Sequence, residues 1–173
     1  MNKILILCFF LTYTLMSKEL INDTKFKNIG KDWIFRKAPE YNYIKKADVK
    51  RGIFSIKTIQ SSEARLLSLS TAIELKAKSK YTLSFEIRGK GEGKVYFQAR
   101  RIRDPKNKKL RLVVGLNKAI EVTDEWAKQT LTFEVTEDLR IIDKTYLCIY
   151  YGIFLGETQV KNISLIEDKS LGI

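Results

Sequence analysis

Apolar and polar residues alternate along most of the chain, and this alternation predicts short β-strands. In the segment YTLSFEIR (residues 81–88) every second residue is apolar, as expected for a strand with one buried face. The same period of two occurs in Lys94–Arg103, Gln129–Val135, Tyr146–Phe154 and Gln159–Glu167. These segments are rich in aromatic and β-branched residues, which favour strands. No stretch keeps a helical period for more than about two turns.

Turn-forming residues separate the predicted strands. The glycines of Gly89–Gly93 (GKGEG) favour a hairpin between the segments at 81–88 and 94–103. Asp104–Asn107 and Thr123–Glu125 predict two more turns. Short strands separated by turns, without repeats or a linker, predict an all-β fold, namely a two-sheet antiparallel β-sandwich. We assign it to residues 18–173 as a single domain, which a chain of 173 residues supports.

The first residues have the composition of a signal peptide. Residues 1–17 read MNKILILCFFLTYTLMS, with Lys3 followed by the apolar run Ile4–Met16. This run suits a signal-peptide core and is too short to cross a bilayer. We therefore expect a secreted, periplasmic or extracellular protein without a transmembrane segment in its mature chain. Cleavage would remove Cys8 and leave Cys148 without a disulfide partner. The alternative is a buried N-terminal helix.

Composition excludes several kinds of catalytic and metal site. The sequence contains no histidine, so it has no Ser-His or Cys-His catalytic pair and no His-ligated zinc. Its two cysteines are too few for a Cys-rich metal site. The 32 Lys and Arg against 20 Asp and Glu give a formal net charge of +12. The function classes that remain are binding and catalysis by carboxylate, Tyr, Lys or Arg side chains.

Four short motifs follow one another along the predicted domain. The first consists of Asn22, Phe26, Gly30 and Trp33. The others are KYTLSFEIR at 80–88, TDEWAKQT at 123–130 and GETQVKNISL at 156–165. In this order they resemble secreted carbohydrate-binding modules of families four, nine and twenty-two, in the galactose-binding-like jelly-roll group. The resemblance implies a jelly-roll β-sandwich that binds a carbohydrate.

The resemblance also implies where a sugar would bind. The polar faces of the segments at 81–88 and 94–103 would line one cleft, to which Thr82 and Ser84 would also belong. The predicted carbohydrate-binding residues are Tyr96, Gln98, Arg100, Glu86, Arg88, Tyr150 and Trp33. Spacing by two places Tyr96, Gln98 and Arg100 on one face of a strand. An aromatic ring, an amide and a guanidinium are groups that a saccharide site uses. The alternative is a solvated face with weak Glu86–Arg100 or Glu86–Arg88 pairs, and Trp33 also suits core packing.

The chain departs from these modules at the positions that often hold a structural calcium ion. The resemblance places acidic calcium ligands after the opening Phe and in a closing Asp-Asp pair. Here those positions carry Lys27 and the pair Lys161-Asn162. Ammonium groups repel a dication that needs carboxylate oxygens. We therefore expect no calcium and no other cofactor.

The densest positive stretch covers residues 100–111 (RRIRDPKNKKLR). Such a stretch attracts polyanions, and outside the cytoplasm the matching partner is an acidic glycan. A solvated hairpin that uses lysine to protect a strand edge is the alternative. No nucleic-acid-binding module is visible, so we expect no nucleic acid partner.

These observations favour a non-catalytic carbohydrate-binding protein. A structural or adhesion module that contacts a protein or the cell envelope is the second hypothesis. A polysaccharide lyase or glycosidase is the third, because Glu86 and Glu134 would face outward on different strands and a glycosidase needs two carboxyl groups. A lyase would pair Arg88 or Arg100 with a Tyr96 or Tyr150 base. Neither carboxylate is marked as catalytic, so we predict no enzyme activity.

Overall fold

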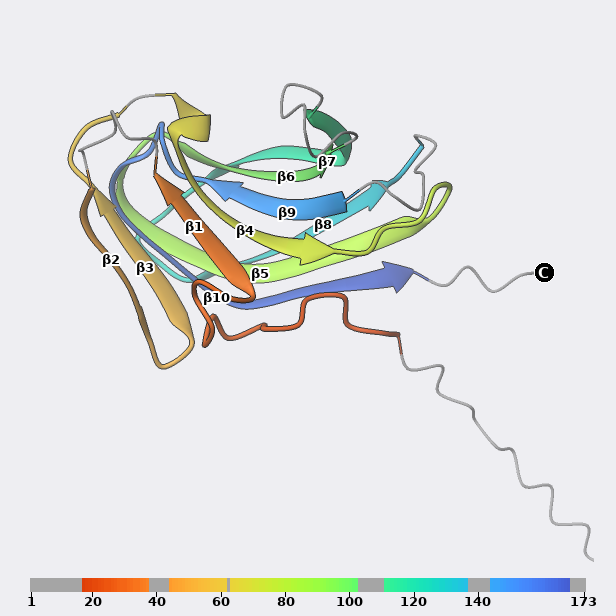
Figure 1. Cartoon of the computed structure of the whole chain (residues 1–173). Coiled ribbons are helices and arrows are strands. Elements are labelled where there is room, and N and C mark those ends of the chain that lie inside the picture. The colour runs from red at the N-terminus through yellow and green to blue at the C-terminus, as the bar shows by residue number, and fades with distance from the viewer. Residues whose placement is uncertain (1–16, 38–43, 62, 103–110, 137–143, 169–173) are drawn as a thin grey trace, which may run out of the picture.

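In the computed structural model, the described residues form ten antiparallel strands in two sheets that face each other, shown as two layers in Figure 1. The structure describes residues 17–37, 44–61, 63–102, 111–136 and 144–168. The predicted all-β fold, a two-sheet antiparallel β-sandwich, is confirmed. The predicted signal peptide at 1–17 and the turn at Asp104–Asn107 lie almost entirely outside the described residues. Within those residues, no helix has the length and apolar character needed to cross a membrane.

The first sheet, named here the β6 sheet, has the strand order β1-β4-β9-β6-β7. Its strands are β1 (Trp33–Lys37), β4 (Leu67–Ile73), β9 (Lys144–Tyr150), β6 (Lys94–Ile102) and β7 (Arg111–Glu121). A single 3-10 turn, Ala64–Leu66, precedes β4 and is the one helical element among the described residues.

The second sheet, named here the β5 sheet, has the strand order β2-β3-β10-β5-β8. Its strands are β2 (Ile44–Lys50), β3 (Ile53–Thr58), β10 (Leu155–Asp168), β5 (Lys80–Glu92) and β8 (Ala127–Glu134). The observed β5, β6, β8, β9 and β10 cover most of the five segments that the alternation predicts, with ends shifted by a few residues.

The core lies between the two sheets and is built from the apolar positions of the alternating pattern. On β5 the side chains of Tyr81, Leu83, Phe85 and Ile87 are all buried, while the residues between them are partly exposed. Phe85 stacks on Phe97 of β6, with ring centroids 4.0 Å apart, and so joins the two layers. Burial of this apolar surface is the main stabilising contribution to such a fold.

The predicted hairpin at Gly89–Gly93 is wrong. Strand β5 continues through Glu92 and pairs with β10, whereas β6 pairs with β9 and β7 in the other sheet. A side chain at Gly91, whose φ is +156°, would overlap the carbonyl oxygen of Leu155 on β10. The glycines therefore permit close approach of two paired strands, and the chain then crosses between the layers at Gly93, whose φ is +103°.

The segment before β1 is folded around Asp23. The carboxylate of this buried residue accepts hydrogen bonds from the backbone N–H of Lys25 (3.2 Å) and of Asn28 (2.8 Å). Its backbone carbonyl accepts a third from Trp33 Nε1, at 2.7 Å. The Trp33 ring packs on Phe26, with centroids 4.9 Å apart. Trp33 thus connects the N-terminal segment to the core through a hydrogen bond to Asp23 and ring packing on Phe26.

Candidate functional site

Four of the predicted site residues meet on the outer face of the β6 sheet. Tyr96, Gln98 and Arg100 alternate along β6 with the buried residues Val95, Phe97 and Ala99 and point away from the core. Tyr150 of β9 is directly opposite Tyr96 in the strand pairing. The predicted grouping of these four residues is therefore present in the structure.

Hydrogen bonds between neighbouring strands hold the polar side chains of this face. Arg100 Nη1 donates to Tyr150 Oη, at 3.0 Å. Gln98 Nε2 donates to Asn117 Oδ1 of β7, at 2.8 Å. Such cross-strand contacts limit the rotamers of the side chains, so less conformational entropy is lost when a ligand binds.

A groove of 420 Å³ runs over these residues and is named here the Tyr96 groove. Its described lining consists of Arg65, Tyr96, Gln98, Arg100, Val113, Tyr150 and Ile153. This lining combines two phenol rings and two aliphatic side chains with an amide and two guanidinium groups. It is thus a partly apolar surface with a few polar groups that can orient a ligand.

Burial raises the pKa of Tyr150 to about 12, despite the opposing effect of the Arg100 guanidinium. At neutral pH the phenol is therefore protonated, and its oxygen accepts a hydrogen bond from Arg100. The groove presents neutral and cationic polar groups, and no carboxylate belongs to its described lining.

Glu86 and Arg88, predicted to share this cleft, lie on the opposite side of the molecule. They belong to β5, whose outward residues, including Thr82 and Ser84, face solvent on the β5 sheet. The prediction of one cleft from both strands is wrong because β5 and β6 are not a hairpin. Trp33 is also excluded from direct ligand contact, since its side chain is fully buried.

Instead, Glu86 and Arg88 belong to a polar network on the β5 sheet. Glu86 accepts a hydrogen bond from Asn162 Nδ2 (2.6 Å) and pairs with Lys161 Nζ (3.1 Å). The Asn162 hydrogen bond and the Lys161 ammonium lower the pKa of the Glu86 carboxyl. Arg88 and Lys161 both lie over the ring of Trp126, at 4.8 and 4.2 Å from its centroid.

The structure adds no test of the calcium prediction based on Lys27 and Lys161. Among the described residues, no group of three or more Cys, Asp or Glu side chains is placed to hold a metal ion. The absence of calcium therefore stays a prediction.

Several residues of the Tyr96 groove were not predicted from the sequence. Arg65 comes from the 3-10 turn before β4, and Val113 comes from β7. Neither segment shows clear alternation, and the pairing of β7 with β6 is a long-range property. Ile153 follows β9 in a loop, where no local pattern indicates which face it joins.

The comparisons with known proteins concern the fold. No family model and no curated protein matches the sequence. A solved family 4 carbohydrate-binding module has a TM-score of 0.67 and 15% identity, covering 87% of this chain and 95% of that one. The N-terminal cellulose-binding domain of Cellulomonas fimi β-1,4-glucanase C has a TM-score of 0.64 and 15% identity, covering 88% and 99%.

A third similar structure is the CBM22-1 xylan-binding domain of Paenibacillus barcinonensis Xyn10C. Its TM-score is 0.53 at 14% identity, and the match covers 89% of this chain and 97% of that one. Near-complete coverage of these chains means that the whole described sandwich, rather than one sheet, is shared. The chain has the jelly-roll β-sandwich fold of carbohydrate-binding modules, as the motifs in its sequence predict.

Proposed function

We propose that this protein is a non-catalytic carbohydrate-binding protein that holds a saccharide in the Tyr96 groove. The observation that carries the proposal is the convergence of Tyr96, Gln98, Arg100 and Tyr150 in one groove of a carbohydrate-binding-module fold. The similar structures support a carbohydrate as the class of ligand, and the groove supports the location.

Each side chain has a distinct role in this proposal. The half-buried ring of Tyr96 offers an apolar surface for the C–H groups of a sugar ring. The Gln98 amide donates and accepts hydrogen bonds, which suits paired hydroxyl groups. Arg100, oriented by Tyr150, donates to ring or hydroxyl oxygens. Ligand hydroxyls thus find both donors and acceptors.

A binding role is favoured over catalysis by the chemistry of the groove. Hydrolysis of a glycosidic bond normally requires two carboxyl groups flanking the sugar, and the described lining supplies none. A lyase that used Tyr150 as its base would need a phenolate, but the raised pKa of about 12 keeps this phenol protonated at neutral pH. We further propose that the protein is exported, on the basis of the signal-like composition of residues 1–17.

Isothermal titration with soluble neutral β-glucan and xylan tests the proposal. We expect Tyr96→Ala and Gln98→Ala each to weaken binding about tenfold or more, the effect of losing a stacked ring or a hydrogen-bonding amide. Thr130→Ala is the control, because this exposed residue lies on the outer face of the β5 sheet. Binding that Tyr96→Ala and Gln98→Ala leave unchanged would place the site elsewhere.

Two other outcomes would overturn parts of the proposal. Release of reducing or unsaturated sugar ends during the titration would show catalysis. If no glycan binds but a protein of the cell envelope is retained on the immobilised wild-type protein, the fold serves adhesion instead. Circular dichroism of every variant checks that the fold is intact.

A further inference from the structure

The outer face of the β5 sheet carries a surplus of positive charge. Strand pairing aligns its outward residues in rows: Lys46 with Lys57, Glu157 and Lys90; Asp48 with Ser55, Gln159 and Arg88; and Lys50 with Ile53, Lys161, Glu86 and Lys128. Arg51 extends the third row from the turn after β2. Cationic side chains thus clearly outnumber the three carboxylates on this part of the face.

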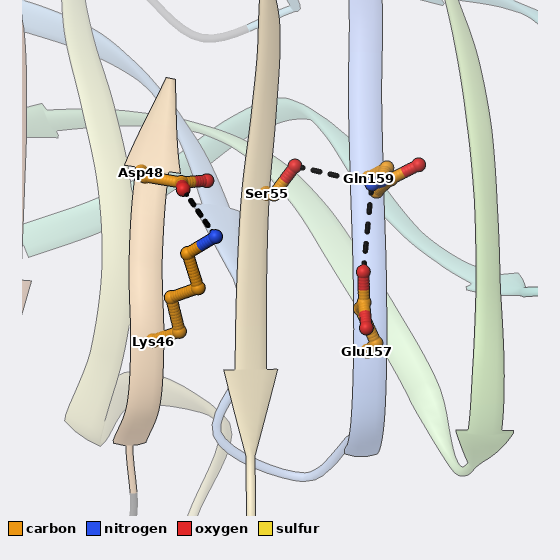
Figure 2. Close-up of polar contacts among 5 residues, drawn as sticks. All are labelled: Lys46, Asp48, Ser55, Glu157 and Gln159. Atoms are coloured by element: carbon orange, nitrogen blue, oxygen red, sulfur yellow. Dashed lines mark hydrogen bonds and ion pairs between the residues drawn. The ribbon is translucent and has the colours of Figure 1, made fainter. Parts of the chain in front are cut away.

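Within this face lies a groove of 370 Å³, named here the Gln159 groove. Its polar floor is drawn in Figure 2, where Gln159 of β10 lies between Ser55 of β3 and Glu157. Gln159 Nε2 donates to Ser55 Oγ (3.3 Å) and to Glu157 Oε1 (3.5 Å). Its Oε1 accepts from Arg88 Nε, at 2.7 Å. Contacts from three strands therefore fix the orientation of this amide.

Three cations on the rim of this groove have no acidic partner in the part of the chain that the structure describes. Lys46 is paired with Asp48, with 2.6 Å between Nζ and Oδ2. Lys50, Arg51 and Lys57 also line the groove and are exposed. Among the described residues, no ion pair involves any of these three. The rim therefore attracts an anion that approaches from solvent, most strongly at low ionic strength.

We propose that the Gln159 groove is a second binding surface, which takes an acidic polysaccharide bearing carboxylate or sulfate groups. Lys50, Arg51 and Lys57 bind the anionic groups. The polar side chains of Asp48, Ser55, Glu157 and Gln159 bind hydroxyl groups. The rows of Lys57 and Lys50 are four residues apart along the strands, which corresponds to about 13 Å. This span favours an extended chain over a small ion.

The same residues argue against a nucleic acid. Single strands are normally held by stacking of bases on exposed aromatic rings. Among the described residues, the aromatic side chain beside this face is Trp126. Its ring is covered by Arg88 and Lys161. The carboxylates of Asp48 and Glu157 in the groove repel phosphodiesters, but they accept hydrogen bonds from sugar hydroxyls.

This inference goes beyond the proposed function and does not rest on it, because the two grooves lie on opposite sheets and share no residue. The test uses the full chain with polygalacturonate and dextran sulfate as probes at low salt. The site variant is Lys50→Gln/Arg51→Gln/Lys57→Gln. Its control is Lys18→Gln/Lys31→Gln/Lys78→Gln, which changes three exposed lysines outside both grooves and lowers the net charge equally.

We expect the site variant to bind at least one acidic polymer about tenfold more weakly than the wild type, as three lost charge contacts imply. The control should stay within about twofold, and added salt should weaken wild-type binding. Equal weakening of the two variants would show unspecific charge attraction and overturn the proposal. Failure of both polymers to bind the wild type would also overturn it.

Cross-tests separate this surface from the Tyr96 groove. Tyr96→Ala should keep its affinity for the acidic polymer, and the site variant should keep any affinity for neutral glycan. If Tyr96→Ala abolishes binding of the acidic polymer while the site variant retains it, the proposed location is wrong. Tighter binding of a DNA duplex or of anionic lipid vesicles than of both acidic polymers would show that the ligand class is wrong.

Discussion

Two buried tyrosines offer a matched test of hydrogen bonding inside the sandwich. Tyr81 and Tyr151 have side chains that are 0% and 1% exposed. Tyr81 Oη accepts a hydrogen bond from the backbone N–H of Lys76, at 2.7 Å. Tyr151 Oη is buried and has no hydrogen-bond partner among the described residues. Replacing each residue by Phe removes a hydroxyl oxygen that is hydrogen-bonded in Tyr81 and has no partner among the described residues in Tyr151.

The two substitutions should change the free energy of unfolding differently. Tyr81→Phe leaves the Lys76 amide without its partner, so the free energy of unfolding should fall by about 1–2 kcal/mol. Tyr151→Phe removes a hydroxyl whose burial is uncompensated, so stability should be unchanged or should rise by up to about 1 kcal/mol. In a domain of this size each kcal/mol corresponds to roughly 2–4 °C in melting temperature.

Urea unfolding followed by fluorescence, together with calorimetry at neutral pH, measures both variants. Each substitution retains the aromatic ring, so apolar packing is kept and the comparison reports on the hydroxyl group alone. A Tyr151→Phe variant that is destabilised as much as Tyr81→Phe would refute the reasoning, because it would show that the Tyr151 hydroxyl contributes a favourable interaction.

Three further predictions concern the N-terminal turn, the strand crossing and the alkaline limit of stability. Asp23→Ala removes two charge-assisted hydrogen bonds from backbone N–H groups to a buried carboxylate and should lower the free energy of unfolding by about 2–4 kcal/mol in urea titrations; an unchanged midpoint would contradict this. Gly91→Ala should cost about 1–3 kcal/mol by thermal unfolding, because its methyl group would overlap the Leu155 carbonyl, whereas a neutral result would mean that β10 moves freely. The folded pKa of Tyr150, raised from 10.0 to about 12, makes a contribution to stability that is complete below pH 10 and is lost as the pH rises to 12. Tyr150→Phe should therefore lose stability less steeply over this range in alkaline unfolding, and identical slopes would show that folding does not raise the pKa of Tyr150.

The sequence predicts the strands well because burial on one face leaves a local pattern. Tyr81, Leu83, Phe85 and Ile87 are buried as their alternation indicates, and Tyr151 is buried as well. Side chains at spacing two must share a face whichever sheet the strand joins. The grouping of Tyr96, Gln98 and Arg100 follows from this geometry alone.

The assignment of strands to sheets could not be predicted in the same way. Gly89–Gly93 has the composition of a hairpin turn, but its glycines are needed for contact with β10, which is about 65 residues away in the sequence. That partner is not visible in the local pattern. Consequently Glu86 and Arg88 were predicted on the wrong face, although their outward orientation was predicted correctly.

The crossing of the chain at Gly93 has a consequence for how such a molecule can diversify. The residues just before this point contribute side chains to one solvent-facing surface, and those just after it contribute to the reverse side. Substitutions at outward positions of β5 can therefore accumulate without altering the chemistry displayed by β6. Selection can act on either surface separately, while the shared apolar interior between them is kept.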